Sequence, residues 1–201
     1  MEIGNPQEPR QTQPIPAKRP ADKSTAREWV TTLAMALILA WIIRSFLVEP
    51  FIVVGASMDP TFATGQFLLV DRITYRFTAP QRDDVIVFHY PKDPTQDYIK
   101  RIIGLPGETV TIADGHVSVQ TGASSTPIAL NEPFIDGSHA SHDTFTETLG
   151  STEYFVMGDN RLESSDSRVW GPLPADLIVG RPLVRLTPLT QISVLPGAYH
   201  Q

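Results

Sequence analysis

The hydrophobic positions of this chain form one long apolar run followed by several short ones. The long run, WVTTLAMALILAWII at residues 29–43, contains no charged residue. As a helix rising about 1.5 Å per residue it spans about 22 Å, less than a hydrocarbon core of about 30 Å. Continuing to Val48 extends the helix to about 30 Å, and the long side chain of Arg44 can extend toward the headgroups. We therefore expect one transmembrane helix over residues 29–48.

Two other interpretations of this run fit less well. A cleaved signal peptide has its small residues after the apolar run, whereas Ala34 and Ala36 lie inside it, and the long polar segment 1–28 precedes it. A buried core helix does not need tryptophans near both ends, whereas Trp29 and Trp41 suit the membrane interface. A retained helix with the lipid bilayer as its partner is the preferred interpretation.

Basic residues lie on one side of the run only. Residues 49–68 contain neither Lys nor Arg, whereas residues 9–28 contain Arg10, Lys18, Arg19, Lys23 and Arg27. The positive-inside rule then places the N-terminus in the cytoplasm. The sequence predicts a disordered cytoplasmic tail at 1–28, a single-pass helix at 29–48 and an extracytoplasmic domain at 49–201. The expected location is a cell membrane, a bacterial plasma membrane in preference to a thylakoid membrane.

The later runs are short and rich in β-branched and aromatic residues, which is typical of strands. Turn sequences such as Leu-Pro-Gly and Asp-Gly separate them. Residues 120–150 are polar and irregular, which predicts a surface insertion or a small excursion of the sheet. With 18 prolines and 13 glycines in the chain, we expect a mostly β domain with strands within residues 67–77, 84–90, 98–105, 108–119 and 153–159.

Composition excludes several kinds of chemistry. Cysteine is absent, so the chain has no disulfide, thiolate nucleophile or cysteine metal site. Residues 50–201 carry 10 Lys or Arg against 17 Asp or Glu, without a basic run, which argues against nucleic acid as a partner. His139 and His142 suggest a metal pair, but no third ligand lies beside them. We expect neither a metal nor another cofactor.

The stretch VVGASMDPTF, residues 53–62, predicts a tight corner around Ser57. Gly55 allows backbone angles closed to other residues, and Pro60 fixes the exit. A serine near a turn usually serves only the turn. Because Asp59 stands two residues after Ser57, this is not the G-x-S-x-G elbow of α/β-hydrolases. Ser57 needs a base elsewhere in the chain to become a nucleophile.

Lys100 is a candidate base. In YIKRIIGL, residues 98–105, strand alternation places it on one face with Tyr98 and Ile102. An ordinary lysine, with a pKa of about 10.4, is protonated at neutral pH, but burial without a carboxylate partner lowers that pKa by up to about 3–5 units. Lys100 is therefore either a buried base or a lysine that extends from an edge strand into solvent.

A third polar segment, MGDNRLESSDSR at residues 157–168, follows the last predicted strand. It holds two arginines, three acidic residues and three serines. One interpretation is a surface loop with local hydrogen bonds from side chains to the backbone. The other is a loop that supplies a hydroxyl to orient a buried amine and an Asp–Arg pair to stiffen the site.

Together, the segments SMDPTF, YIKRIIGLPGE and GDNRLESSDSR resemble, in this order, the conserved boxes of type I signal peptidases. DDVIVF resembles the family's intervening strand box, and ADGHVSV with LNEPFI its later connecting region, so the resemblance covers about residues 29–186. It implies antiparallel sheets of the fold shared with SOS-response repressors and a Ser–Lys dyad that needs no cofactor. It also implies that signal peptides are removed from exported preproteins at the outer membrane face.

The resemblance assigns roles by position. Ser57 matches the nucleophile and Lys100 the general base. Ser164 matches the hydroxyl that hydrogen-bonds the lysine amine, and Asp166 and Arg168 match the supporting ion pair. Shallow pockets that accept alanine at the minus-one and minus-three positions of a signal peptide, and exclude larger side chains, are implied. The residues that align with their lining are Phe51, Val53, Met58, Phe62, Tyr98 and Ile99.

Two further positions belong to this implied site. Asp159 begins the box that contains Ser164. At Gly55 some family members have a serine whose hydroxyl helps stabilise the oxyanion, although glycine is also found there. The oxyanion hole must then rest on backbone N–H groups, that of Ser57 first. A lost donor costs about 3 kcal/mol of transition-state stabilisation if nothing replaces it.

Two alternative functions are weighed against a membrane-bound serine endopeptidase. An autoprotease of the SOS-repressor type has a related catalytic fold, but it requires a DNA-binding module where this chain has an apolar run. A membrane-anchored β module without catalysis would need none of Ser57, Lys100 and Ser164. We therefore expect an enzyme that acts on signal peptides.

Overall fold

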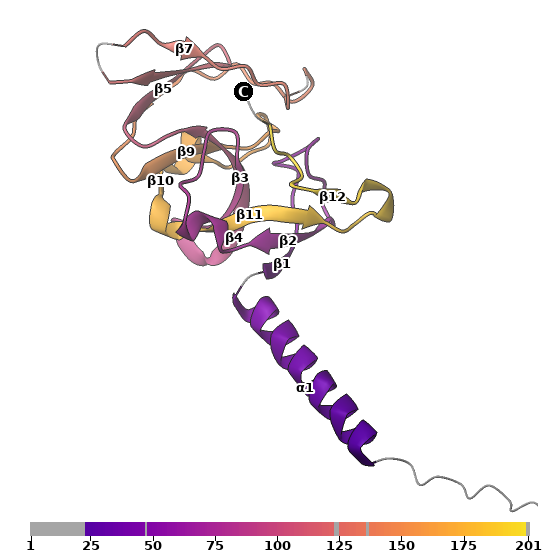
Figure 1. Ribbon diagram of the computed structural model, residues 1–201. Coiled ribbons are helices and arrows are strands. Elements are labelled where there is room, and N and C mark those ends of the chain that lie inside the picture. Colours follow the sequence, from indigo (N-terminus) through magenta and orange to yellow (C-terminus); the bar gives the residue numbers. More distant parts are fainter. Residues whose placement is uncertain (1–22, 47, 123–124, 136, 200–201) are drawn as a thin grey trace, which may run out of the picture. The chain divides into compact units, whose positions relative to one another are not determined.

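The computed structural model describes residues 23–46, 48–122, 125–135 and 137–199, so most of the predicted tail lies outside the described residues. The chain divides into two compact units, residues 1–40 and 41–201. A helix is observed over most of the predicted span 29–48, as α1 (Lys23–Phe46; Figure 1), but with other bounds. Residues 23–28, expected in the disordered tail, belong to this helix, and Val48 begins the first strand. Within the described ranges, no helix combines the length and the hydropathy that crossing a membrane requires.

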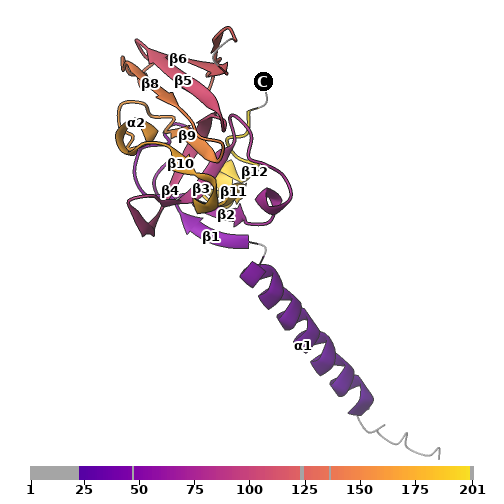
Figure 2. The ribbon, with the colours of Figure 1, turned by 90° about the vertical axis from the view of Figure 1, so that its left-hand side faces the viewer.

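The second unit is built on two antiparallel β-sheets (Figures 1 and 2), which confirms the predicted mostly β fold. The larger sheet has the strand order β1-β2-β11-β3-β4-β9-β10, with β12 paired to β11. Lys100 lies on β4, an interior strand between β3 and β9. The strands are β1 (Val48–Ile52), β2 (Phe67–Asp71), β3 (Val85–Tyr90), β4 (Asp93–Gly104), β9 (Glu153–Met157), β10 (Leu173–Pro174), β11 (Ile178–Arg185) and β12 (Ser193–Val194).

The smaller sheet has the order β7-β6-β5-β8. Its strands β5 (Glu108–Ala113) and β6 (His116–Thr121) form a hairpin, because Asp114 and Gly115 adopt the positive φ angles that an Asp-Gly turn favours. The irregular segment predicted at 120–150 returns to this sheet twice, as β7 (Ile128–Ala129) and β8 (Phe145–Thr148). Apolar side chains from β5 and β6 share one core with those of β4 and β9.

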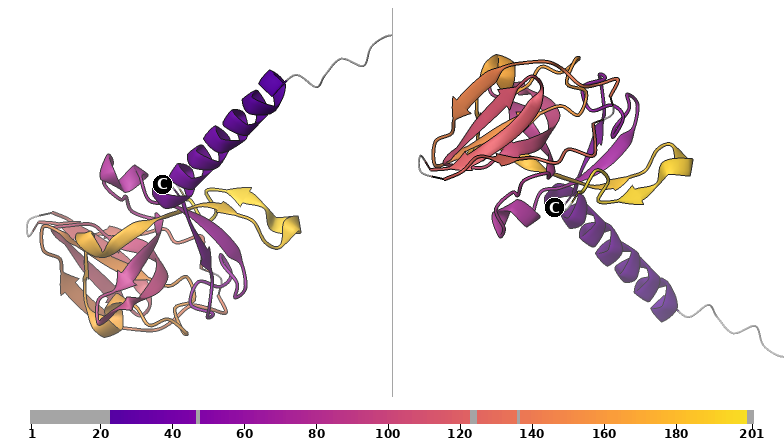
Figure 3. Two further views of the ribbon diagram at one scale, coloured as in Figure 1. Left: turned by 90° about the horizontal axis from the view of Figure 1, so that it is seen from below. Right: turned by 90° about the horizontal axis from the view of Figure 1, so that it is seen from above.

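Two differences from the predicted strands have local causes. The strand predicted over 67–77 ends at Asp71, whose Oδ1 accepts the N–H groups of Ile73 and Thr74 and starts a short 3₁₀ helix, η1 (Thr74–Arg76). Strand β11 was not predicted, because a glycine and a proline interrupt its apolar pattern. In the sheet, its pairing shifts register once against β2 and once against β3. In Figure 3, β11 continues through η3 (Leu189–Gln191) into β12 as a projecting hairpin.

Candidate active site

Ser57 lies in the segment that joins β1 to β2, and hydrogen bonds hold this segment from two sides. Val53 N–H donates to Gln66 O at 2.9 Å, which closes the segment on itself. Gly55 has a φ of 97°, a conformation that glycine adopts without strain. From the polar loop, Asn160 N–H donates to Ser57 O at 3.1 Å. The backbone that carries the hydroxyl is therefore fixed.

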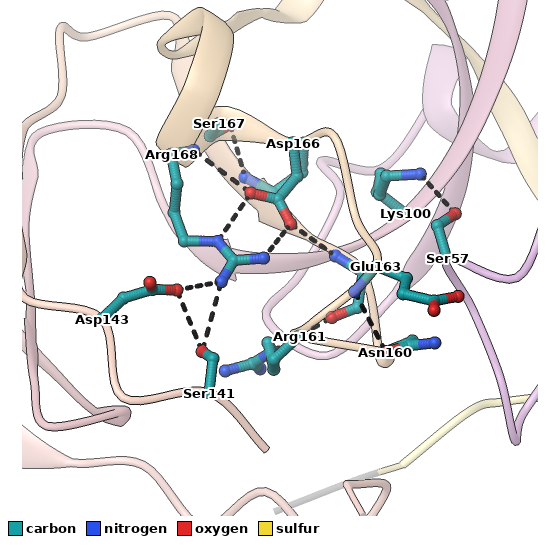
Figure 4. A network of polar contacts seen from close by, with 12 residues as sticks. Ser57, Lys100, Ser141, Asp143, Asn160, Arg161, Glu163, Asp166, Ser167 and Arg168 are labelled. Atoms are coloured by element: carbon teal, nitrogen blue, oxygen red, sulfur yellow. Dashed lines mark hydrogen bonds and ion pairs between the residues drawn. The ribbon is translucent and has the colours of Figure 1, made fainter. Parts of the chain in front are cut away.

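Lys100 reaches this hydroxyl from β4. Its Nζ lies 2.8 Å from Ser57 Oγ and donates to Ile99 O at 2.9 Å (Figure 4). The residue is 3% exposed, and β4 is not an edge strand, because it pairs with β3 on one side and β9 on the other. The structure thus selects the buried lysine and excludes the lysine that extends from an edge strand.

The electrostatic environment of Lys100 favours its neutral form. Burial lowers the pKa of Lys100 from 10.5 to about 8, while the carboxylates of Asp166 and Asp159 act in the opposite direction but less strongly. A useful fraction of the amine is then unprotonated near neutral pH, whereas an ordinary lysine is almost wholly charged. Its lone pair can accept the proton of a hydroxyl 2.8 Å away.

The polar loop after β9 packs closely on the Ser57 segment. A Cβ atom at Gly158 would clash with the carbonyl oxygen of Ser57, so only glycine allows this approach. Asp166, at the start of the short helix α2 (Ser167–Trp170), accepts from Arg168 Nε at 2.9 Å and Nη2 at 2.8 Å and from Gly158 N–H at 3.1 Å. Burial alone would raise the pKa of Asp166, but the bonds with Arg168 outweigh it and hold the pKa below its ordinary value.

Ser164 does not make the contact that the sequence implied. Its Oγ is buried, yet within the described residues no atom lies in hydrogen-bonding geometry to it. The hydroxyl is near enough to Asp166 to help lower the pKa of that carboxyl. Lys100 instead donates to the carbonyl of Ile99 on its own strand. The predicted bond from Ser164 to the lysine amine is therefore absent from the part of the chain that the structure describes.

Asp159 forms a fully buried ion pair with Arg101, a residue that the sequence analysis did not single out. Arg101 Nε and Nη2 donate to the two carboxylate oxygens at 2.8 and 2.7 Å, and both side chains are 0% exposed. Its Nη1 donates to two backbone carbonyls, and the guanidinium stacks on a phenylalanine ring at 4.0 Å. The available signal was a second basic residue next to Lys100 in an otherwise apolar strand.

Two arginines attach the polar loop to the insertion at 120–150. Arg161, with 2% of its side chain exposed, forms a two-pronged ion pair with Glu132. Arg168 bonds Asp143 in addition to its partner in the loop (Figure 4). The insertion, which the sequence presented as irregular surface, therefore supports the segment that holds Ser57 in place.

A groove of about 490 Å³ opens beside the Ser57–Lys100 contact. Four of the predicted substrate-binding residues line it: Phe51, Val53, Tyr98 and Ile99. Met58 and Phe62 do not; both are 0% exposed and pack with Leu68 and Val85 in the core beneath the segment. The family resemblance aligned them with the pocket lining, but here their apolar side chains pack in the core.

The same groove contains residues that the sequence analysis did not assign to it. Ile52, Val54 and Ala56 continue its apolar wall, and their position between assigned residues was the available signal. Asp97 and Glu163 bring carboxylates to a surface that was expected to be apolar. Nothing in the local sequence pattern distinguished these two from solvent-exposed acids.

A serine hydroxyl in contact with a buried, partly neutral lysine amine is an arrangement for covalent catalysis. Together with the antiparallel sheets and the groove beside it, this contact is of the kind that a serine hydrolase needs. The family model described as signal peptidase, peptidase S26, matches residues 26–187. The chain therefore belongs to the signal peptidase family, and it is a serine endopeptidase of the signal peptidase I type.

Individual relatives agree with this membership. The chain is 36% identical over 192 residues to signal peptidase I of Leptolyngbya laminosa, covering 91% of each chain. It is 33% identical over 178 residues to signal peptidase I of Pseudomonas aeruginosa, covering 71% of this chain and 63% of the other. A crystal structure of signal peptidase I from Enterococcus faecalis V583 shares 32% identity, with a TM-score of 0.44 over 52% of this chain and 97% of the other.

Proposed function

We propose that this chain removes N-terminal signal peptides from exported preproteins, with Ser57 as nucleophile and Lys100 as general base. The observation that carries the proposal is the 2.8 Å contact between the buried lysine amine and the serine hydroxyl at the end of the groove. A family member that used another nucleophile would have no need of this contact.

In the first half of the reaction, the neutral Lys100 amine takes the Ser57 proton as Oγ attacks the scissile carbonyl carbon. The carbonyl π electrons move to oxygen and form a tetrahedral oxyanion. When that intermediate collapses, the C–N bond breaks, and the Lys100 ammonium gives its proton to the departing amine. The mature protein leaves with a new N-terminus, and the signal peptide stays as an ester on Ser57.

In the second half, water attacks the ester carbonyl while Lys100 takes one of its protons. Collapse of this intermediate breaks the C–Oγ bond, returns the proton from Lys100 to Ser57 Oγ and releases the signal peptide as a carboxylic acid, which loses its remaining proton to solvent. The proposed oxyanion donor is the Ser57 N–H, which makes no hydrogen bond to any described residue. Gly55 adds no side-chain donor, so the hole relies on backbone groups.

The remaining polar residues position the dyad in this proposal. Asp166 and Arg168 hold the loop that packs on Ser57, and Asp159 holds the opposite face of β4 through Arg101. Ser164 packs against Gly158 within the same loop. It acts on the dyad through that loop, since it does not bond the lysine in this structure.

The substrate preference is tested by cleavage of a preprotein in detergent or lipid. Phe51, Val53, Tyr98 and Ile99 form shallow apolar walls, so alanine at the minus-one and minus-three positions is expected to be accepted. Phenylalanine at minus-one is expected to lower kcat/KM at least about 100-fold, because the family resemblance implies shallow pockets that accept alanine and exclude larger side chains. Sequencing the new N-terminus locates the cut, and Ser57→Ala is the control for contaminating proteases. Cleavage that ignores these positions would contradict the proposal.

Activity is expected to rise with pH through about 8. Only the neutral amine accepts a proton, and its fraction increases as the pH passes the lowered pKa of Lys100. The measurement is kcat/KM across the pH range, with the substrate free of titrating groups near the cut. A profile that stays flat down to about pH 5 would rule out a lysine base.

We propose further that residues 29–48 anchor the enzyme in the membrane with its N-terminus in the cytoplasm. The support is the uncharged apolar run and the basic residues on one side of it. Alkaline carbonate extraction of cells is expected to leave the chain in the membrane fraction, and protease added outside the cytoplasm should digest only the β domain. Recovery in the soluble fraction would contradict the anchor.

A further inference from the structure

The groove has few charged side chains, and more of them are acidic than basic. Among its lining residues only Lys100, Asp97 and Glu163 are ionisable with charge near neutral pH, and the rest of the wall is apolar or neutral. With its pKa lowered to about 8, the buried Lys100 amine is still mostly protonated at neutral pH, but its one charge stands against two exposed carboxyls. A peptide in the groove therefore meets a field that is negative on balance.

Glu163 belongs to the polar loop that packs on the Ser57 segment. Its backbone N–H donates to Asn160 Oδ1 at 3.1 Å, which fixes where the side chain emerges. In Figure 4 the carboxylate extends away from the Arg161 and Asp166 network, on the side where Ser57 lies. Within the described residues it has no ion pair or side-chain hydrogen bond. Its charge is therefore uncompensated.

Asp97, which lines the groove from β4, is partly compensated. It precedes Lys100 by three residues on β4, which at about 3.3 Å per residue corresponds to about three residues of an extended substrate. His89 Nδ1 lies 2.7 Å from its Oδ1, and this pair is itself exposed. Asp97 should therefore act more weakly than Glu163.

We infer that Glu163, assisted by Asp97, makes this groove select preproteins with a basic residue close to the cleavage site and discriminate against acidic ones. The inference rests on the proposed function, because it concerns the same groove and the same substrates. It adds a charge preference to the small residues expected at minus-one and minus-three. The substrate class is thus a signal peptide whose cleavage region carries Lys or Arg within about three residues of the cut.

The expected size of the effect follows from the exposure of these carboxylates. Exposed charge pairs contribute little, so one Lys in place of Gln should raise kcat/KM about two- to five-fold, and one Glu should lower it similarly. The ratio between otherwise identical Lys and Glu substrates is then about tenfold. Salt screens such pairs, so the ratio should shrink at about 1 M salt.

The experiment compares preproteins that differ only by Lys, Gln or Glu at single positions around the cut, with minus-one and minus-three kept as alanine. In Glu163→Gln the Lys-to-Glu ratio is expected to fall to about threefold, and in Glu163→Lys to invert, because the sign of the charge reverses. Asp97→Asn should reduce the ratio less. Asp176→Asn, which removes an exposed carboxylate outside the groove lining, is the matched control and should leave the ratio unchanged.

The outcomes separate this inference from the proposed function. If the wild-type chain cleaves the Gln substrates but the Lys-to-Glu ratio is near one, or is unaltered in Glu163→Gln and Glu163→Lys, the charge preference is wrong and the peptidase assignment stands. If no substrate is cleaved, the proposed function fails and this inference fails with it. A ratio that inverts in Glu163→Lys cannot come from a loss of folding, which would lower all rates together.

Discussion

Replacement of Lys100 by methionine is expected to abolish cleavage and to stabilise the fold. Methionine fills a similar volume but offers no lone pair that can take the Ser57 proton, so kcat should fall about 10⁴-fold or more. The stabilisation arises because burial disfavours the ammonium, as the fall in the pKa of Lys100 from 10.5 to about 8 records. At about 1.4 kcal/mol per pKa unit, this costs the folded wild-type protein about 3 kcal/mol.

The pH dependence of that cost has a definite sign. A lysine whose folded pKa is lowered binds fewer protons in the folded state than in the unfolded state, so stability increases with pH between the two values. The cost is fully present below a pH of about 8 and disappears as the pH rises toward 10.5. In denaturant unfolding, the stability of the Lys100→Met protein should therefore exceed that of wild type most clearly at neutral pH, and the two should converge at high pH.

Lys100→Arg provides the matched control. Arginine keeps the positive charge and cannot be deprotonated in a protein, so this variant should be inactive and less stable than wild type. Normal cleavage by the methionine variant would end the assignment of Lys100 as base. Inactivity of both variants with a stability loss in each would mean that the lysine is mainly structural.

Arg101→Met is expected to produce the largest loss of stability among single substitutions at the site. It leaves the Asp159 carboxylate buried without its guanidinium, with Thr61 Oγ1 as a remaining donor. Breaking a buried ion pair costs about 3–5 kcal/mol, a large part of the stability of about 5–15 kcal/mol that is typical of a folded domain. The measurement is the denaturant midpoint of the full chain, with the slope checked for two-state behaviour.

The double variant Arg101→Met with Asp159→Asn distinguishes this ion pair from simple packing. Once the carboxylate is neutral, no charge remains buried, so the double variant should recover part of the stability that Arg101→Met loses. Additive losses would show that the two side chains do not depend on each other. A loss below about 1 kcal/mol in Arg101→Met would contradict the importance of the pair.

The residues that the sequence identified for chemistry share one property: each stands out locally. Ser57 lies on a corner rich in turn formers, Lys100 interrupts an apolar strand, and Asp166 with Arg168 lies in a dense polar loop. Their positions in the sequence do not give the distances between their side chains, however. The strand pattern alone also left open whether Lys100 is buried or exposed. Only the pairing of β4 with strands on both sides settles that point.

The failures have equally specific causes. Met58 and Phe62 were assigned to the pocket lining by their alignment with the family, and an alignment does not show whether an apolar side chain faces the groove or the core beneath it. Glu132 and Asp143 were overlooked because their arginine partners lie in a distant segment of the chain. A carboxylate in a polar segment looks the same whether it meets water or a guanidinium. Long-range ion pairs of this kind require the fold.

The conformation of Gly55 has a consequence for the evolution of the site. A side chain added there meets no atom within 4 Å, yet the φ of 97° disfavours any residue other than glycine. A mutation to serine would strain the backbone by about 1–2 kcal/mol, whatever rate gain its hydroxyl brought as the oxyanion donor that the family resemblance implies. The gain would be in turnover, and the cost in the stability of the fold. Selection at position 55 therefore depends on the stability margin of the rest of the chain, so substitutions far from the groove decide when that change is tolerated.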